Sequence, residues 1–385
     1  MTDKFELTQF FKPGEQLTQV TGSEKENSGK RDTDQLCDAY EQIVSDGVSE
    51  SCEILRFQKK LGTGGQGVVY LSERIGTDKF VLPVALKIFS PLRYDTEEEY
   101  ISAMQRMAAV STKIALVQHN NLLNVNNWSE QRQIRVMEME MVDGKDLSKI
   151  ILPKTLSWLR ENCSASRYSY LKNVVLDHGT KNLRFKTGAA ITIINECLNG
   201  LGALHREGIV HSDVKPSNIM IKRTGSAKII DMGSAYLLAE APQRRSCTPA
   251  YAPPEVLDND PPTVLSDLAS LGYVFLELLT GKSLFPKQSS HIQEKRAIDS
   301  HIESILGAPL CENSVLVAFC KKLVAPNPAD RFQSAYEAAT SDKDGAPAIL
   351  RQLIKMNLAS EYPNDLRILM EDLSCMDDDY NLDNC

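Results

Sequence analysis

The sequence predicts a protein of the α+β class, with strands concentrated in its first half and helices in its second. Short segments with a strand pattern lie at residues 54–60, 68–70, 84–89 and 134–142. Segments with a helical pattern lie at 96–118, at 191–201 with one apolar face, and at 268–280 with apolar residues nearly all round. The last pattern is typical of a helix at the centre of a domain.

Composition sets the broad class of the protein. The chain has 385 residues, of which 42% are hydrophobic and 24% charged, and this favours a globular protein of two or three units. The net charge of −8 argues against a nucleic-acid-binding surface over the whole chain. The nine cysteines show no Cys-x-x-Cys spacing, which predicts neither a zinc site nor a disulfide framework and fits a reducing compartment.

The sequence carries no recognisable targeting signal. Asp3 and Glu6 interrupt the start of the chain, so we expect no signal peptide. No apolar run reaches the roughly 18 residues of a membrane span, and the best candidate, 268–280, carries Glu277. From these absences we expect a cytoplasmic protein.

Both ends of the chain differ in composition from its middle. Residues 1–52 form a polar extension, for which we expect disorder apart from one short helix at Leu36–Val48; a regulatory role is the alternative. Residues 341–385 form a tail with expected helices at Ala348–Leu358 and Asp365–Leu373. Residues 371–385 contain six acids and no base, which predicts a solvated, disordered end.

Two polar clusters stand inside apolar sequence between residues 205 and 233. The first places His211, Asp213, Lys215 and Asn218 within eight positions, and the second begins at Asp231, thirteen residues after Asn218. In this first cluster Asp213 can accept a proton, and Lys215 supplies a nearby positive charge.

A predicted hairpin connects the two clusters. Ile219–Ile221 and Ala227–Ile230 have the pattern of short strands, and Arg223–Ser226 has the composition of a turn. Such a hairpin brings Asn218 and Asp231 to the same end. An amide oxygen and a carboxylate placed together suit Mg²⁺, which prefers oxygen ligands.

A glycine-rich run at residues 61–70 suggests phosphate binding. Gly62, Gly64, Gly67 and Val69 fit the pattern Gly-x-Gly-x-x-Gly-x-Val, in which glycines let the backbone approach phosphates closely. A dinucleotide-binding fold uses a similar run. However, residues 68–70 continue as a strand rather than a helix, and Lys87 follows within an apolar strand, twenty residues after Gly67.

In combination these segments resemble the eukaryotic-type (Hanks-type) serine/threonine protein kinases. The stretch His211–Asn218 resembles His-Arg-Asp-x-Lys-Pro-x-Asn, with Ser212 in place of the arginine, and Asp231–Gly233 resembles Asp-Phe-Gly. The stretch Thr248–Glu255 resembles Gly-Thr-x-x-Tyr-x-Ala-Pro-Glu, with Cys247 for the glycine and Pro253 for the alanine. The resemblance covers about residues 53–340.

The resemblance implies a two-lobed protein-kinase-like fold. It has a small β-rich lobe at 53–140 and a larger, mainly helical lobe at 141–340, with an insertion at about 155–187. We expect this insertion to be surface decoration, with a docking element as the alternative. The resemblance also implies that Asp267 holds the backbone of the catalytic loop by hydrogen bonds, and that Arg331 pairs with Glu255.

The same resemblance implies ATP and Mg²⁺ as cofactors and assigns the site residues. Asp213 would orient the acceptor hydroxyl and accept its proton, Lys215 would steady the γ-phosphate, and Lys87 would hold the α- and β-phosphates. Asn218 and Asp231 would bind Mg²⁺. The residues expected to bind nucleotide are Leu61, Gly62, Thr63, Gly64, Gly65, Gln66, Gly67, Val69, Ala85, Lys87, Met139, Glu140, Met141 and Asp146.

The sequence departs from the kinase pattern at two positions. A glutamate usually holds the strand lysine, but no acid occurs from Tyr100 to Ser129. We therefore expect Gln105 to hydrogen-bond Lys87 as a neutral substitute, or else Glu98 or Glu99 to reach it through a displaced helix.

The second departure is Ser212, where kinases that are switched by phosphorylation carry an arginine. A phosphate needs a cationic group to order a loop around it. We therefore expect activity independent of phosphorylation at Ser246, with control through the flanks or through a partner at the insertion. In the alternative, Arg244 or Arg245 folds back and binds the phosphate.

The function expected from the resemblance is phosphoryl transfer from MgATP to serine or threonine hydroxyls of a protein substrate. A pseudokinase, which keeps the fold as an ATP-binding or scaffold module, is the first alternative, because the helix glutamate is missing. A kinase of small molecules is the second, although the stretch Thr248–Glu255 resembles a peptide platform and argues against it.

Overall fold

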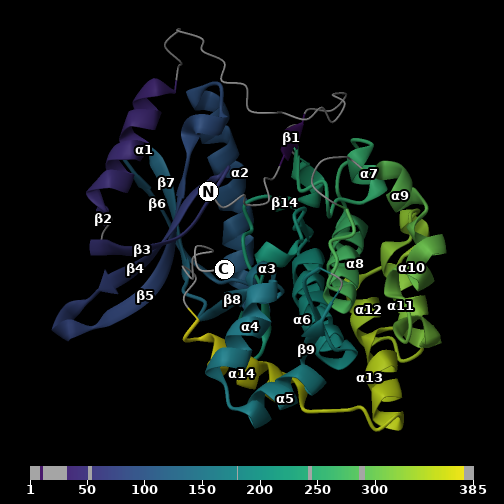
Figure 1. Cartoon of the computed structure of the whole chain (residues 1–385). Coiled ribbons are helices and arrows are strands. Elements are labelled where there is room, and N and C mark those ends of the chain that lie inside the picture. The colour runs from purple at the N-terminus through teal and green to yellow at the C-terminus, as the bar shows by residue number, and fades with distance from the viewer. Residues whose placement is uncertain are drawn as a thin grey trace.

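The computed structural model describes residues 9–11, 33–50, 54–179, 181–241, 245–285 and 291–376. A lobe built on one antiparallel sheet lies beside a larger helical lobe (Figure 1). The strand order in the sheet is β2-β3-β4-β5-β7-β6. These strands are β2 (Val48–Glu50), β3 (Ile54–Gly64), β4 (Gly67–Ile75), β5 (Val81–Phe89), β6 (Val125–Gln131) and β7 (Ile134–Glu140). The predicted α+β class and two-lobed architecture are confirmed.

Burial explains the arrangement of the small lobe. Strand β5 lies between β4 and β7, and every residue from Val84 to Phe89 is buried, which fits a central strand. Helix α2 (Glu97–Val117) packs against β6. It begins where predicted, because the Thr96 side chain accepts the backbone N–H of Glu99 and three glutamates occupy the first turn.

Part of the predicted polar extension belongs to this lobe, which corrects the expectation of disorder. Helix α1 (Asp34–Asp46) forms two residues earlier than predicted and packs on the sheet through Leu36 and Ile43. Strand β2 then joins the sheet edge beside β3. A further short strand, β1 (Gln9–Phe11), pairs antiparallel with β15 (Arg245–Cys247) of the other lobe. Residues 12–32 of the polar extension lie outside the described residues.

The helical lobe surrounds helix α8 (Val264–Thr280), in which every residue from Ser266 onward is buried. Thr263 and Ser266 cap its start reciprocally, and Gly281, at φ +64°, ends it in the left-handed conformation that glycine favours. Helix α6 (Thr187–Arg206) packs beside α8. The predicted hairpin forms as β12 (Ile219–Lys222) and β13 (Ala227–Ile229), and β8 (Gly144–Asp146) extends it.

The remaining elements complete this lobe. Its short strands are β9 (Leu176–His178), β10 (Leu183–Phe185), β11 (Ile209–Val210) and β14 (Tyr236–Leu237). Its other helices are α3 (Leu147–Ile150), α4 (Pro153–Asn162), α5 (Ala165–Val174), α7 (Pro254–Leu257), α9 (Ile292–Arg296), α10 (Ile298–Leu306), α11 (Ser314–Val324), α12 (Ala335–Thr340), α13 (Ala346–Lys355) and α14 (Tyr362–Leu373). In the described part of the chain, no helix combines the length and apolar character needed to cross a membrane.

The insertion predicted at 155–187 is not surface decoration, and this expectation is wrong. Its segments α4, α5, β9 and β10 bury Leu156, Leu159, Leu171 and Phe185, and β10 packs against α8. Apolar side chains on one face of each short helix explain this burial, because two isolated helices of this length need a partner surface. The insertion is thus part of the core of the helical lobe.

The C-terminal tail packs on the insertion and on the hairpin. The two predicted tail helices form as α13 and α14, and α14 contacts α4, α5, α6 and β12. Arg167 pairs with Asp372, and the Tyr170 hydroxyl donates to Asp365 at 2.6 Å. Lys145, next to the hairpin in β8, donates to the carbonyl of Met376. The predicted acidic end from residue 377 lies outside the described residues.

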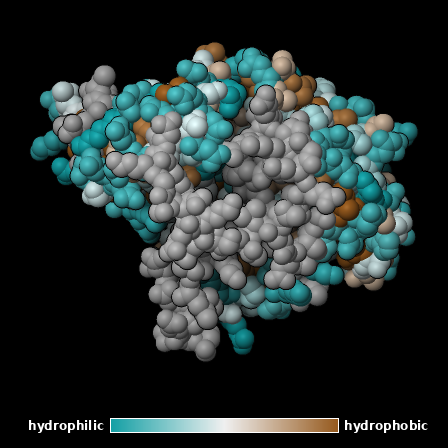
Figure 2. Space-filling view, turned by 90° about the horizontal axis from the view of Figure 1, so that it is seen from above, coloured by the Kyte–Doolittle hydropathy of each residue, from teal (hydrophilic) through white to brown (hydrophobic). Residues whose placement is uncertain are grey.

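The described surface is mostly hydrophilic on the face seen from above, where hydrophobic residues occur singly or in small groups (Figure 2). Such scattered hydrophobic residues are ordinary on a folded protein and mark no binding site by themselves.

The packing of α14 predicts that the tail stabilises the whole fold. Replacing the fully buried Leu366 by alanine (Leu366→Ala) leaves a cavity and should lower the free energy of unfolding by about 2–5 kcal/mol. The same change at the exposed Leu358 (57% exposed) should cost less than about 0.5 kcal/mol. Urea unfolding compares the two variants. Equal, small losses would mean that α14 does not belong to the cooperative fold.

Candidate active site

One buried carboxylate on α8 fixes the backbone of the loop that carries Asp213. Asp267, 1% exposed, accepts the backbone N–H groups of His211 and Ser212, each at 2.8 Å. His205 Nε2 lies 2.9 Å from the same carboxylate. Ser212 adopts a φ of +70°, which is unfavourable for a residue with a side chain, so these hydrogen bonds offset a local cost. The predicted role of Asp267 is confirmed.

Three buried side chains meet at the centre of this loop. Thr248 Oγ1 donates to Asp213 Oδ1 at 2.7 Å, and Lys215 Nζ lies 3.0 Å from Thr248 Oγ1 and 2.9 Å from Asp213 Oδ2. Each of the three residues is 5–6% exposed. A lysine and a threonine on either side fix the orientation of the Asp213 carboxylate. They also tie the loop to the segment that begins at Thr248.

The hairpin brings Asn218 and Asp231 together, as the sequence predicts. Ile219 pairs with Ile229, and the Ile230 N–H donates to the Asn218 carbonyl at 2.8 Å. Asn218 Nδ2 donates to the Asp213 carbonyl at 2.8 Å, and this commits the nitrogen and leaves the amide oxygen as the donor atom for a cation. An amide oxygen and a carboxylate form a donor set that fits Mg²⁺ together with phosphate oxygens.

Lys87 pairs with Asp231, and the predictions for its partner are wrong. Its Nζ forms an ion pair with Asp231 Oδ1 and lies 2.7 Å from Gln66 Oε1. Gln105 is exposed, as are Glu98 and Glu99. The residues that α2 buries are Tyr100, Met104, Val110, Ser111 and Ile114, none of which is charged. Because α2 presents no charge inward, the nearest carboxylate neutralises the lysine.

This ion pair keeps Asp231 charged. Burial of the carboxylate would raise its pKa, but the Lys87 ammonium, through its charge and its hydrogen bond, outweighs this effect and lowers the pKa to about 2. Lys215 and the Gly233 N–H act in the same direction. Asp231 is therefore ionised throughout the physiological pH range, as a magnesium ligand must be.

The glycine-rich segment forms the end of the β3–β4 hairpin and lies over Asp231–Gly233. Gly67 has a φ of +138°, and a side chain there would come within 1.9 Å of the Ile88 carbonyl oxygen, so glycine is required. Gln66 Nε2 also donates to Ser234 Oγ at 3.3 Å. From the sequence we expected Gln66 to bind nucleotide. Nothing in the sequence indicated that its side chain contacts both Lys87 and Ser234.

Four of the residues predicted to bind nucleotide lie on strands that meet near the hairpin. Ala85 and Met139 face each other across β5 and β7, and both are buried. The Glu140 carboxylate binds the Lys228 ammonium and the Asn124 N–H, so its side chain is committed to the protein. Asp146 caps α3 by accepting the Lys149 N–H at 3.1 Å. Nucleotide contacts at these four residues and at Met141 stay predictions.

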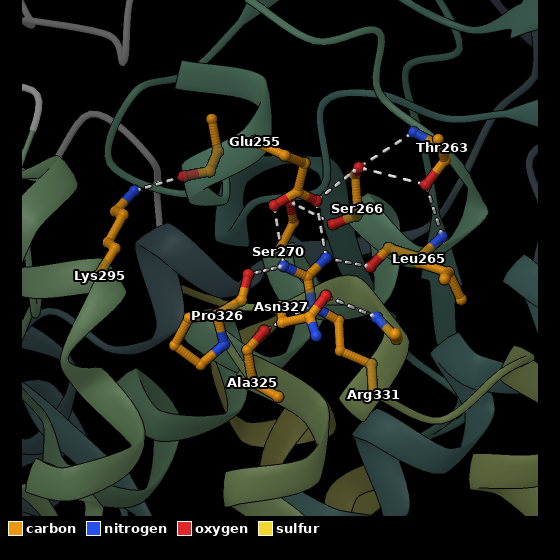
Figure 3. A network of polar contacts seen from close by, with 12 residues as sticks. Glu255, Thr263, Leu265, Ser266, Ser270, Lys295, Ala325, Pro326, Asn327 and Arg331 are labelled. Atoms are coloured by element: carbon orange, nitrogen blue, oxygen red, sulfur yellow. Dashed lines mark hydrogen bonds and ion pairs between the residues drawn. The ribbon is translucent and has the colours of Figure 1, made fainter. Parts of the chain in front are cut away.

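A second buried charge anchors the segment that follows Thr248. Arg331, 1% exposed, donates to both oxygens of Glu255 at 2.7 and 2.8 Å, as predicted (Figure 3). Its remaining N–H groups reach the carbonyls of Ala325, Leu265 and Pro326. Ser266, on α8, donates to Glu255 at 2.9 Å. All donors of the guanidinium therefore have acceptors, as a buried arginine requires.

The fold and these contacts define a protein of the two-lobed kinase class, and comparison with known families agrees. The protein kinase domain family matches residues 55–342. The chain therefore belongs to the protein kinase family.

Several curated proteins that the chain resembles are bacterial. It is 26% identical to the probable serine/threonine-protein kinase PknB of Lactococcus lactis, over 70% of this chain and 39% of that protein. It is 25% identical to the serine/threonine-protein kinase Pkn1 of Myxococcus xanthus, over 84% and 42% of the two chains. It is 26% identical to PknL of Mycobacterium tuberculosis, over 72% and 62%. The chain thus spans less than two thirds of the length of each of these relatives.

The Arg331–Glu255 pair predicts a large effect on stability. Arg331→Met leaves Glu255 without its partner in a buried setting and should lower the free energy of unfolding by about 3–5 kcal/mol. Lys321→Met removes the partner of Glu303 at the surface, where the side chains are 41% and 61% exposed, and should cost less than about 1 kcal/mol. Denaturant unfolding measures both. Similar losses in the two variants would contradict the anchoring role of Arg331.

Proposed function

We propose that the protein is a serine/threonine kinase that transfers the γ-phosphoryl group of MgATP to hydroxyl groups of a protein substrate. The observation that carries this proposal is the contact of Asp213 with Lys215 and Thr248, beside Asn218 and Asp231 at the end of the hairpin. The protein kinase domain match and the names of the bacterial relatives support it.

In this proposal the residues act mainly by positioning. Asp213, with its carboxylate oriented by Thr248 and Lys215, accepts the proton of the substrate hydroxyl. Lys215, whose Nζ already lies beside that carboxylate, binds a γ-phosphate oxygen. Asn218 and Asp231 would hold Mg²⁺, which would supply positive charge beside the phosphates.

The Lys87–Asp231 ion pair has to open when MgATP binds. Lys87 would then hold the α- and β-phosphates, and Asp231 would hold the metal. Gln66 gives up its contact with Lys87 in the same step. When this ion pair opens, the phosphates would supply the counter-charge for Lys87 and Mg²⁺ would supply that for Asp231, so both charges stay neutralised only if nucleotide and metal are bound together. We infer that nucleotide and Mg²⁺ bind cooperatively, and that the missing glutamate weakens phosphate placement without abolishing it.

One observation favours a pseudokinase as the second candidate function. The buried residues of α2 carry no charge that could pair with Lys87, and Lys87 is bound to the metal-site aspartate. A pseudokinase of this kind would bind ATP and transfer no phosphate. The retention of Lys87, Asp213, Asn218 and Asp231 in one site supports the enzyme.

We further propose that the N-terminal flank controls access of the protein substrate. Strand β1 pairs with β15, and Gln9 lies opposite Cys247. Cys247 directly precedes Thr248, which binds the catalytic Asp213. A substrate peptide that reaches Asp213 has to pass along this segment, so β1 competes with it. A partner that binds the flank would relieve this competition.

The magnesium site predicts the effect of Asp231→Asn. Replacing the carboxylate by an amide removes the charged metal ligand, and phosphoryl transfer should fall by about two orders of magnitude or more while the fold is kept. The exposed Asp299, changed in the same way, is the control and should leave the rate unchanged. Transfer of labelled phosphate from ATP to a generic basic protein is the measurement. An Asp231→Asn enzyme as fast as the wild type would refute the assignment.

Control by the flank predicts different outcomes for two substitutions. Phe10→Pro removes a backbone N–H and disrupts the β1–β15 pairing, and activity toward the basic protein should rise several-fold.

Ser246→Ala, with or without phosphatase treatment, should leave activity unchanged, because Ser212 supplies no charge to bind a phosphate. A large loss of activity in Ser246→Ala would contradict independence of phosphorylation at this residue. No change of activity in Phe10→Pro would contradict control by the N-terminal flank. The alternative anchoring by Arg244 lies outside the described residues.

A further inference from the structure

A lysine of α9 lies with its ammonium group inside the helical lobe. Lys295 is 0% exposed, although it belongs to a short helix near the surface of the lobe. Its Nζ donates to the backbone carbonyls of Pro249, Ala250 and Ala252 at 2.6, 3.0 and 2.6 Å. Figure 3 shows its side chain reaching toward the segment that precedes Glu255.

The surroundings of this group match an ammonium ion. Three carbonyls accept from its three N–H bonds, whereas a neutral amine has only two to offer. The rings of Tyr273 and Phe285 lie at 5.0 and 4.6 Å and add favourable cation–π contacts. Burial lowers the pKa of Lys295 to about 7, which reflects the cost of removing its charge from water.

Among the groups around Lys295, the three backbone carbonyls are the main partners of its ammonium group. Glu255 is bound by both nitrogens of the Arg331 guanidinium. Burial raises the pKa of the Cys247 thiol to about 12, so this group is neutral. Removing a charged group from water is costly, and here the hydrogen bonds to three carbonyls and the two ring contacts offset that cost. The position of Lys295 is therefore better explained by the backbone that it fixes than by a gain in stability.

The backbone that Lys295 fixes lies between two anchored points. At one end Thr248 donates to Asp213, and at the other Glu255 binds Arg331. Between them, Tyr251 donates to Glu277 of α8 at 2.6 Å. Without Lys295, the inward carbonyls of residues 249–252 would lose their donor, and the segment would be held mainly at Thr248, Tyr251 and Glu255. This segment adjoins the group that receives the substrate proton.

We propose that Lys295 is a positioning residue for the protein substrate, which fixes the backbone of residues 249–252 as the platform for the peptide around the acceptor hydroxyl. Its ammonium group touches neither the nucleotide-binding residues nor the reacting groups. It sets the affinity for protein substrates and does not act on the binding of ATP. This inference rests on the proposed kinase function.

The test compares Lys295→Met and Lys295→Arg with the exposed control Lys282→Met in the full chain. Steady-state transfer to a generic basic protein gives KM for that protein, KM for ATP and kcat. For Lys295→Met we expect KM for the protein to rise about tenfold, because an ordered platform is lost. We expect kcat and KM for ATP to stay within about twofold. Lys295→Arg, which keeps the charge, should recover part of the affinity, and Lys282→Met should match the wild type.

A second readout separates this inference from the proposed function. Binding of a fluorescent basic peptide is measured at equilibrium, and it should weaken about tenfold in Lys295→Met even if the wild type transfers no phosphate. Thermal unfolding shows whether each variant is folded, and Lys295→Gln, which retains two N–H donors, replaces Lys295→Met if that variant unfolds. Unchanged peptide affinity and KM in a folded variant would overturn the inference. An equal loss of ATP affinity would also overturn it, since that would indicate general loosening of the fold.

Discussion

The arrangement of the site depends on the buried carboxylate of Asp267. This charge stands on α8, the most completely buried helix, and it fixes two consecutive backbone N–H groups of the loop that carries Asp213. A buried charge is costly unless all its hydrogen-bonding capacity is used. Asp267 meets that condition through the loop itself, so the loop and the helix stabilise each other. Arg331 and Lys295 repeat the principle on the following segment, where buried cations hold Glu255 and three carbonyls.

The second feature of the site is the direct pairing of Lys87 with Asp231. In this chain the inner face of α2 carries no charge, so the lysine and the metal-site aspartate neutralise each other. The position of α2 is consequently not coupled to the charge of Lys87. Its packing instead depends on Tyr100, whose hydroxyl contacts the Phe89 carbonyl and the Arg135 N–H, and on its buried apolar residues. Control by movement of this helix is therefore less favoured than control through the flanks.

The sequence could predict those parts of the structure that local pattern and backbone chemistry determine. The hairpin between Asn218 and Asp231, the cap of α2 and the Arg331–Glu255 pair are of this kind. It could not predict the partner of Lys87, because that choice depends on which side chains α2 turns inward. It also underestimated the insertion and the N-terminal helix, whose short apolar faces become informative only once α8, α14 and the sheet supply surfaces to cover them. Nothing in the sequence indicated that Lys295 is buried, since a lysine at the end of a polar loop is ordinarily exposed.

The central claim is that Asp213 and its neighbours form a working phosphotransfer site. The most direct measurement compares the wild type with Asp213→Asn for transfer of labelled γ-phosphate to a basic protein, with ATP affinity measured in parallel. The account predicts transfer by the wild type, a loss of about a hundredfold or more in the variant, and similar ATP affinity in both. A wild type that binds MgATP and transfers no phosphate would contradict the account and favour a pseudokinase.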